Sequence, residues 1–294
     1  MTADMRTRAA ETVCELFVDD PRVAVVLADI STDRFAPALR HDPSRAVNLG
    51  IMEQTMVGVA AGFAMEGFHP VMHTIAPFVA ERALEQLKLD FGNQELGGLV
   101  ITVGGSYDYA SEGTTHHSPG DVQALLTIAA ADVLVPGTGD EAAALIRATY
   151  DDGRLTYLRT QVTANARPRT VEHGRISVER SGAGPTVIAV GPMLDRTLAA
   201  VADRDVTVLY ATTVSPFDGE GLRAAMSGDE VVVVEPMLAG TLSPLVAAAL
   251  VDRPVRIRSI GVPREVIRAY GTPEQLDAAV GLDTAGIRTQ LLGE

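Results

Sequence analysis

The acidic residue Glu53 begins an otherwise apolar segment that is rich in small residues, EQTMVGVAAGFAM. If this segment is a helix, Glu53 shares one face with the residues at offsets of 3, 4, 7, 8 and 11, which are Met56, Val57, Ala60, Ala61 and Ala64. A carboxyl group on a buried face must either keep its proton or meet a hydrogen-bonding partner. The pattern leaves two interpretations open: a functional acid in a pocket, or a first-turn acid that interacts favourably with the helix dipole.

A second candidate is the long polar loop GGSYDYASEGTTHHSPGD, which follows a predicted strand and contains two of the six histidines, His116 and His117. Loops at the carboxyl ends of parallel strands commonly carry function. A histidine there can donate a proton or contact an oxyanion. Adjacent histidines can also bind zinc, but no matching cluster of cysteine, histidine or carboxylate accompanies them, so the sequence predicts no metal site.

Two further charged residues lie at the carboxyl ends of predicted strands, Asp29 after VAVVLA and Arg159 after LTYL. A planar guanidinium at a strand's carboxyl end suits a bidentate contact with phosphate or carboxylate. The alternatives are a turn aspartate at Asp29 and a surface ion pair between Arg159 and Asp151 or Asp152.

Short β-branched runs that alternate with helical patterns must position these residues. The predicted strands are 23–29, 69–75, 97–103, 131–136 and 155–160 in the first half, and 186–191, 206–211, 230–235 and 255–261 in the second. The alternation predicts an α/β fold with two consecutive α/β domains and mostly parallel sheets. We expect domains over residues 1–162 and 185–294, joined by a linker at 163–184 that is rich in Arg, Pro and Gly and contains at most one irregular strand.

The helical patterns are less sharply bounded than the strands. They predict helices over residues 8–17, 243–250 and 263–270, a helix that begins near Asp121, and one that carries Pro77 in its first turn, with Ala80, Ala83, Leu84, Leu87 and Phe91 in register behind it. The segment PGTGDEA weakly matches a dinucleotide-binding motif. No carboxylate ends the following strand, so we interpret Asp140 as a helix N-cap instead.

Composition excludes several classes of protein. The 294 residues contain 24 Lys and Arg against 38 Asp and Glu, and the net charge of −14 argues against nucleic acid or an anionic membrane as a partner. The longest apolar run, residues 56–65, is too short to cross a bilayer, and the N-terminus lacks a signal-peptide pattern. The single cysteine, Cys14, fits a reduced, cytoplasmic setting.

The segment NLGIMEQTMVGVAAGFAMEGFHPVMHTIAPFVAERALEQLKLD resembles the pyrimidine-binding domain of transketolases, in which a glutamate lies in the same Gly-Ile-x-Glu context. The resemblance continues through SEGTTHHSPGDVQALLTI and VLVPGTGDE to GVPREVIRAYGTPEQLDAAVGLDTAGI, and so spans about Ala9 to about Leu292. It implies that Glu53 meets N1′ of the aminopyrimidine of thiamine diphosphate and shares a proton with it. The cofactor would supply the carbon chemistry, while the protein orients it.

The same resemblance implies roles for other cofactor-binding residues. Phe78 stands where the family has an aromatic side chain against the aminopyrimidine ring. Asp29 corresponds to an aspartate near the thiazolium, and Ile51 belongs to the Gly-Ile-x-Glu phrase. Ile75 and Glu81 replace neighbouring aromatic residues of the family, which implies a pocket of different detail.

The substrate side departs further from the family. The family phrase Asp-Gly-x-Thr-His is here EGTTH, which makes Glu112 the contact for substrate hydroxyls and His116 the histidine at the substrate entrance. Gly105 replaces a further family histidine, and Arg159 matches an arginine that binds the substrate phosphate. These differences imply a donor or acceptor unlike the usual sugar phosphates.

The family's diphosphate-binding domain, with its Gly-Asp-Gly and downstream Asn, has no counterpart in this sequence. The chain is similar to the smaller subunit of a split transketolase. We therefore expect a heterotetramer in which thiamine diphosphate lies between this chain and a diphosphate-binding subunit that supplies most Mg²⁺ ligands. The implied reaction is transfer of a two-carbon ketol unit from a ketose or 2-oxo donor to an aldehyde. The alternatives are a deoxyxylulose-phosphate-synthase-like activity, a 2-oxo-acid dehydrogenase β-like subunit, or a non-catalytic assembly subunit.

Overall fold

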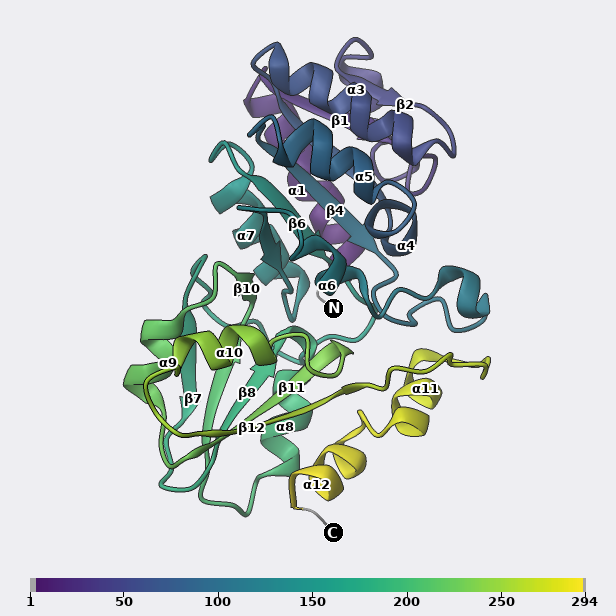
Figure 1. The fold of residues 1–294 in the computed structure, drawn as a ribbon. Helices are drawn as coiled ribbons and strands as arrows, with labels where there is room; N and C mark the ends of the chain where they lie inside the picture. Colours follow the sequence, from purple (N-terminus) through teal and green to yellow (C-terminus); the bar gives the residue numbers. More distant parts are fainter. Residues whose placement is uncertain (1–3, 293–294) are drawn as a thin grey trace.

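The computed structural model describes residues 4–292, which form two α/β units one after the other along the chain (Figure 1). The first unit contains helices α1 (Met5–Asp19), α2 (Ala36–His41), α3 (Glu53–Met65), α4 (Ala76–Ala80), α5 (Leu84–Gln86), α6 (Asp121–Leu125) and α7 (Gly139–Thr149). A π-helical turn, Leu87–Gly92, and a 3-10 turn, Gly113–His116, complete its helical segments. Its strands are β1 (Val23–Leu27), β2 (Ala46–Asn48), β3 (His69–Ile75), β4 (Gly98–Val103), β5 (Asp132–Leu134) and β6 (Leu155–Arg159).

The second unit begins inside the expected linker. Its strands are β7 (Ile176–Arg180), β8 (Thr186–Val190), β9 (Thr207–Ala211), β10 (Thr213–Ser215), β11 (Glu230–Leu238) and β12 (Arg256–Val262). Its helices are α8 (Leu194–Ala200), α9 (Gly219–Ala225), α10 (Ser243–Ala249), α11 (Pro273–Val280) and α12 (Thr284–Leu292), with a 3-10 turn at Gly191–Met193.

Both sheets are mostly parallel, which confirms the predicted fold class. The first sheet has seven strands in the order β10-β5-β6-β4-β3-β1-β2, and the second has five in the order β12-β11-β8-β9-β7. Only β10, which pairs with β5, and β7, which pairs with β9, are antiparallel. All nine predicted strands are present. The crossing of β10 from the second unit into the first sheet has no counterpart in the sequence pattern.

Three helix predictions are wrong. Residues 263–270 form no helix; the helix begins later, at α11, because Thr272 forms a capping box with Gln275 ahead of Pro273. The N-cap of α7 is Thr138 rather than Asp140, since its side chain accepts from the Glu141 N–H. The single helix expected after Pro77 is broken into α4, α5 and the π-helical turn. Of the five residues predicted to lie in register behind Pro77, Leu84 is half-buried and the other four are buried.

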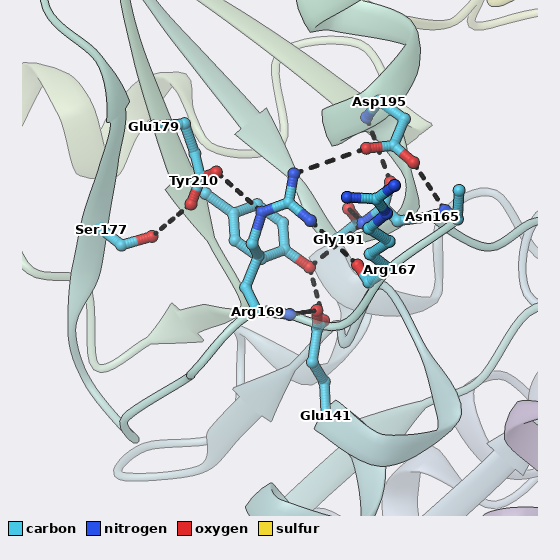
Figure 2. Close-up of polar contacts among 10 residues, drawn as sticks. Glu141, Asn165, Arg167, Arg169, Ser177, Glu179, Gly191, Asp195 and Tyr210 are labelled. Atoms are coloured by element: carbon cyan, nitrogen blue, oxygen red, sulfur yellow. Dashed lines mark hydrogen bonds and ion pairs between the residues drawn. The ribbon is translucent and has the colours of Figure 1, made fainter. Parts of the chain in front are cut away.

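The linker is fixed to both units by buried polar contacts (Figure 2). The Glu141 carboxylate of α7 accepts hydrogen bonds from the Tyr210 hydroxyl of β9 at 2.6 Å and from the Arg169 N–H of the linker at 2.8 Å. Asn165 donates to the Gly191 carbonyl at 3.1 Å. Burial and the adjacent Glu141 carboxylate raise the pKa of Tyr210, so its hydroxyl stays a donor. These contacts fix the linker against residues of both units.

Candidate active site

The carboxyl ends of β1, β3, β4 and β6 meet at one edge of the first sheet, and the residues predicted to do chemistry gather there. Asp29 follows β1, Ile75 ends β3, the histidine loop follows β4 and Arg159 ends β6. Glu53 reaches this edge from the first position of α3. Five sequence-distant segments therefore meet at one edge of the sheet, and four of them bring polar or charged side chains there.

Glu53 is buried, as its position in the helical stripe predicts, with 2% of its surface exposed. Its Oε2 accepts a hydrogen bond from Arg82 Nη1 at 2.6 Å, and its Oε1 accepts a longer one from Thr74 Oγ1 at 3.4 Å. The Arg82 side chain is 43% exposed, so the ion pair joins a buried acid to a base at the rim. The partner that the buried carboxyl required is thus an arginine that sequence reasoning did not identify.

Phe78 lies beside this ion pair on α4. The Arg82 guanidinium carbon lies 4.3 Å from the centre of the Phe78 ring, and the His116 ring lies edge-on at 5.4 Å. Phe78 is half-buried, so part of its side chain is open to solvent. Glu53, Phe78 and His116, predicted separately from three motifs, are therefore linked by a chain of direct contacts through Arg82.

His116 and His117 face different surroundings. The His116 ring is half-buried, with Nδ1 3.0 Å from Thr115 Oγ1 and the Tyr109 ring at 5.9 Å. His117 is buried against Tyr107 at 6.4 Å, and burial lowers its pKa. Of the pair, His116 is the more exposed side chain.

The histidine loop is held in place by the second unit. The Tyr107 hydroxyl donates to Asp277 of α11 at 2.7 Å, and Thr114 donates to the Ile267 carbonyl at 3.3 Å. Figure 1 shows this loop beside the extended segment that precedes α11. Residues 263–270, which we expected to be helical, thus support the loop that carries His116.

Arg159 is fully buried and already partnered. Its Nε donates to Asp121 at 2.7 Å, its Nη2 donates to Ser106 Oγ at 2.7 Å, and its Nη1 donates to Gln161. The surface ion pair with Asp151 or Asp152 is not formed. Sequence reasoning missed Asp121, although this residue begins a helix directly after the histidine loop.

The remaining predicted residues differ in exposure. Asp29 is exposed in the left-handed region at φ 69°, with its N–H donating to Asn48 Oδ1 at 2.9 Å, a turn geometry that aspartate tolerates. Ile51 is 69% exposed, Ile75 is buried, and Glu112 is exposed at the start of the Gly113–His116 turn. Exposed Ile51 and Glu112 are available to a molecule or subunit that covers the edge.

Residues 4–292 contain neither a cluster of potential metal ligands nor a helix able to span a membrane. No group of three or more His, Cys, Asp or Glu side chains in this described part could hold a metal ion. None of its helices combines the length and apolarity that a bilayer crossing requires.

Comparison with known proteins places this geometry in context. The family model for "Transketolase, pyrimidine binding domain" matches residues 1–165, and that for "Transketolase, C-terminal domain" matches residues 174–287. A Rhodococcoides fascians protein named "Uncharacterized 33.6 kDa protein in fasciation locus" is 42% identical over 98% of this chain and 94% of its own length. An apulose-4-phosphate transketolase subunit of Phocaeicola vulgatus is 28% identical over 96% of this chain and 94% of its own.

Two further similarities differ in extent. The 1-deoxy-D-xylulose-5-phosphate synthase of Oleidesulfovibrio alaskensis is 32% identical over 96% of this chain, which spans only 47% of that enzyme. A solved structure described as "Split gene transketolase, inactive beta4 tetramer" superimposes with a TM-score of 0.86 at 23% identity, over 100% of this chain and 98% of that one.

Proposed function

The chain belongs to the transketolase family, and from that premise we propose that it is the β-type subunit of a split transketolase. In this proposal it transfers a two-carbon ketol unit from a ketose or 2-oxo donor to an aldehyde acceptor. Thiamine diphosphate lies at the interface with a diphosphate-binding partner subunit.

One observation supports the cofactor most directly: a planar nitrogen group already lies between Glu53 and Phe78. The Arg82 guanidinium donates a hydrogen bond to the first and lies over the ring of the second. An aminopyrimidine is also planar and also offers nitrogen to a carboxyl group. The site's residues therefore fit that half of the cofactor.

Thiamine diphosphate supplies the nucleophilic carbon when bound. The chain's own residues then have distinct tasks. Glu53 holds a proton at N1′ in surroundings from which water is largely excluded, and Phe78 orients the ring by packing against it. His116, in contact with Phe78, exchanges a proton with a substrate oxygen.

Substrate binding falls to Glu112 and Arg159. Glu112 is exposed at the start of the turn that ends at His116 and can accept hydrogen bonds from substrate hydroxyls. The Arg159 Nε donates a hydrogen bond to the Asp121 carboxylate, while the two terminal nitrogens donate to the neutral side chains of Ser106 and Gln161. A substrate anion would replace those neutral partners and leave the ion pair intact.

Asp29, Ile51 and Ile75 are the remaining proposed cofactor contacts. A partner subunit is proposed because the matched models are the pyrimidine-binding and C-terminal domains, and because one relative is itself named as a subunit of a transketolase. The partner would bring the diphosphate site and most Mg²⁺ ligands. We propose a heterotetramer of two copies of each chain, in the cytoplasm.

The test uses this chain with and without its companion subunit. We expect tight, Mg²⁺-dependent thiamine diphosphate binding only in the complex; equally tight binding by the lone chain would refute the shared site. Glu53→Gln should lower turnover by about 10²–10⁴-fold, because the amide has no acidic proton to share. Glu141→Gln, at a second buried carboxylate outside this site, is the matched control and should retain turnover per folded molecule. Unchanged turnover in Glu53→Gln would favour a non-catalytic assembly subunit.

A deoxyxylulose-phosphate-synthase-like activity is the second candidate, favoured by the 32% identity to such an enzyme. Product analysis separates the two candidates. Release of carbon dioxide from pyruvate with formation of a 1-deoxyketose would support the synthase-like reaction. Transfer from hydroxypyruvate to an aldehyde would support ketol transfer.

A further inference from the structure

Arg82 has no task in the proposed reaction, yet it contacts two of its central residues. It lies in the turn between α4 and α5, where the expected continuous helix is broken. Its Nη1 lies 2.6 Å from Glu53 Oε2, and its guanidinium carbon lies 4.3 Å from the centre of the Phe78 ring. Its only charged contact among the described residues is with Glu53.

The guanidinium and an aminopyrimidine would use the same two partners. Both are flat, both present nitrogen to a carboxyl group in the ring plane, and both pack against an aromatic face. One carboxylate oxygen and one ring face cannot serve both groups together. Arg82 must therefore move before the cofactor ring reaches Glu53.

The surroundings make that exchange physically reasonable. A buried carboxylate without a partner is costly, so Glu53 needs one whether or not the cofactor is bound. The Arg82 side chain is 43% exposed and sits beyond the end of α4, so it can leave toward solvent without passing through packed core. Solvent at the rim also weakens the ion pair, which keeps displacement feasible.

We infer that Arg82 is an internal stand-in for the cofactor's aminopyrimidine: it fills the ring's place in the cofactor-free protein and is displaced when thiamine diphosphate binds. This inference rests on the proposed function. The consequence is quantitative: the apparent affinity for thiamine diphosphate equals the intrinsic affinity multiplied by the fraction of molecules in which Arg82 has left the site. Arg82 therefore sets the cofactor concentration at which the complex assembles its active form.

The competing explanation is that Arg82 is only a structural ion pair. Arg154 provides a matched control because its side chain is also 43% exposed and pairs with a fully buried carboxylate, that of Asp132. It lies at the opposite end of the first sheet, just before β6, whereas the candidate site follows the strand ends. Removing either arginine costs stability and one positive charge, but only Arg82 touches the proposed ring site.

The experiment compares the complex of this chain and its companion as wild type, Arg82→Met and Arg154→Met. Thiamine diphosphate binding is titrated in excess Mg²⁺, without substrate, and thermal unfolding is followed with and without cofactor. We expect Arg82→Met to lower the dissociation constant about tenfold and to melt earlier than wild type only when cofactor is absent. Arg154→Met should melt earlier in both conditions and keep the wild-type dissociation constant.

The direction of the change is diagnostic. Loss of a positive charge by itself would weaken binding of an anionic cofactor, so tighter binding in Arg82→Met has to come from removing a competitor. If wild type binds and Arg82→Met binds equally or more weakly, Arg82 is no stand-in, although the proposed function survives. If the wild-type complex binds no thiamine diphosphate, the proposed function fails and this inference with it. If Arg82→Met does not fold, Arg82→Lys replaces it in the experiment. Lysine keeps the positive charge but lacks the planar guanidinium, so this variant should bind thiamine diphosphate more tightly than wild type, by a smaller factor than Arg82→Met.

Discussion

Buried charges define the candidate site at the scale of single residues. Glu53 is paired with a half-exposed arginine, whereas Arg159 and Asp121 form a pair in which both side chains are 0% exposed. A half-exposed partner can be exchanged, but a fully buried one is fixed, because breaking it leaves an uncompensated charge. The two ion pairs therefore suit different tasks: Glu53 is ready for another partner, and Arg159 keeps its position.

Arg159→Met tests this distinction. Loss of the guanidinium leaves the buried Asp121 carboxylate without its ion-pair partner. The Tyr157 hydroxyl, 2.8 Å away, remains as a hydrogen-bond donor to it. We expect the free energy of unfolding, measured with urea, to fall by about 3–5 kcal/mol. The double variant Arg159→Met/Asp121→Leu should recover part of this loss, since it removes both charges. A rise in KM with unchanged stability would mean that Arg159 serves the substrate alone.

At the scale of elements, the histidine loop depends on the second unit for its shape. The loop follows β4 of the first sheet, but its hydroxyl groups bond to α11 and to the extended chain before α11. A loop of this length that contains only a short 3-10 turn, Gly113–His116, among its described residues gains a fixed conformation from such external contacts. The second unit thus positions His116, although it contributes none of the residues predicted for the site.

Tyr107→Phe probes this coupling. The change removes the 2.7 Å hydrogen bond to Asp277, while Asp277 keeps its 2.6 Å ion pair with Arg196, so α11 should stay docked. We expect stability to fall by about 1 kcal/mol and kcat of the complex to fall several-fold as His116 loses its alignment. Tyr210→Phe is the control: it removes a buried hydroxyl from the linker contacts and should cost similar stability without lowering kcat. Equal kcat values for the two variants would contradict the positioning role.

The whole molecule is held together through the linker, which follows β6 and precedes β8. Besides the Glu141 contacts, His173 of the linker forms a 2.8 Å ion pair with the buried Asp132 carboxylate at the start of β5. Arg154 donates to the same carboxylate at 2.9 Å. The linker is therefore fixed to the first unit by charges as well as by packing.

This ion pair predicts a pH dependence of stability. The contact with Asp132 raises the pKa of His173 above its ordinary value of 6.5. A group whose pKa is raised on folding stabilises the protein fully below its unfolded pKa, and that stabilisation is lost as pH rises through the folded pKa. The stability difference between wild type and His173→Gln should thus be largest below about pH 6.5 and shrink above it, measured by urea unfolding across that range. In an Asp132→Asn background the difference should no longer vary with pH.

The sequence by itself determined nine of the twelve strands in the described part of the chain, the mostly parallel α/β class and the burial of Glu53. These features depend on local periodicity and composition, which are properties of residues close together in the sequence. Only the tertiary structure decided that Arg82 meets Glu53, that Asp121 meets Arg159 and that residues 263–270 support the histidine loop. The physical reason is that a charge or a hydroxyl accepts many partners, and which one it finds depends on the path of the chain between them. β10 illustrates the same limit, because it forms by antiparallel pairing with β5 of the first unit, and the sequence pattern predicted neither the strand nor the pairing.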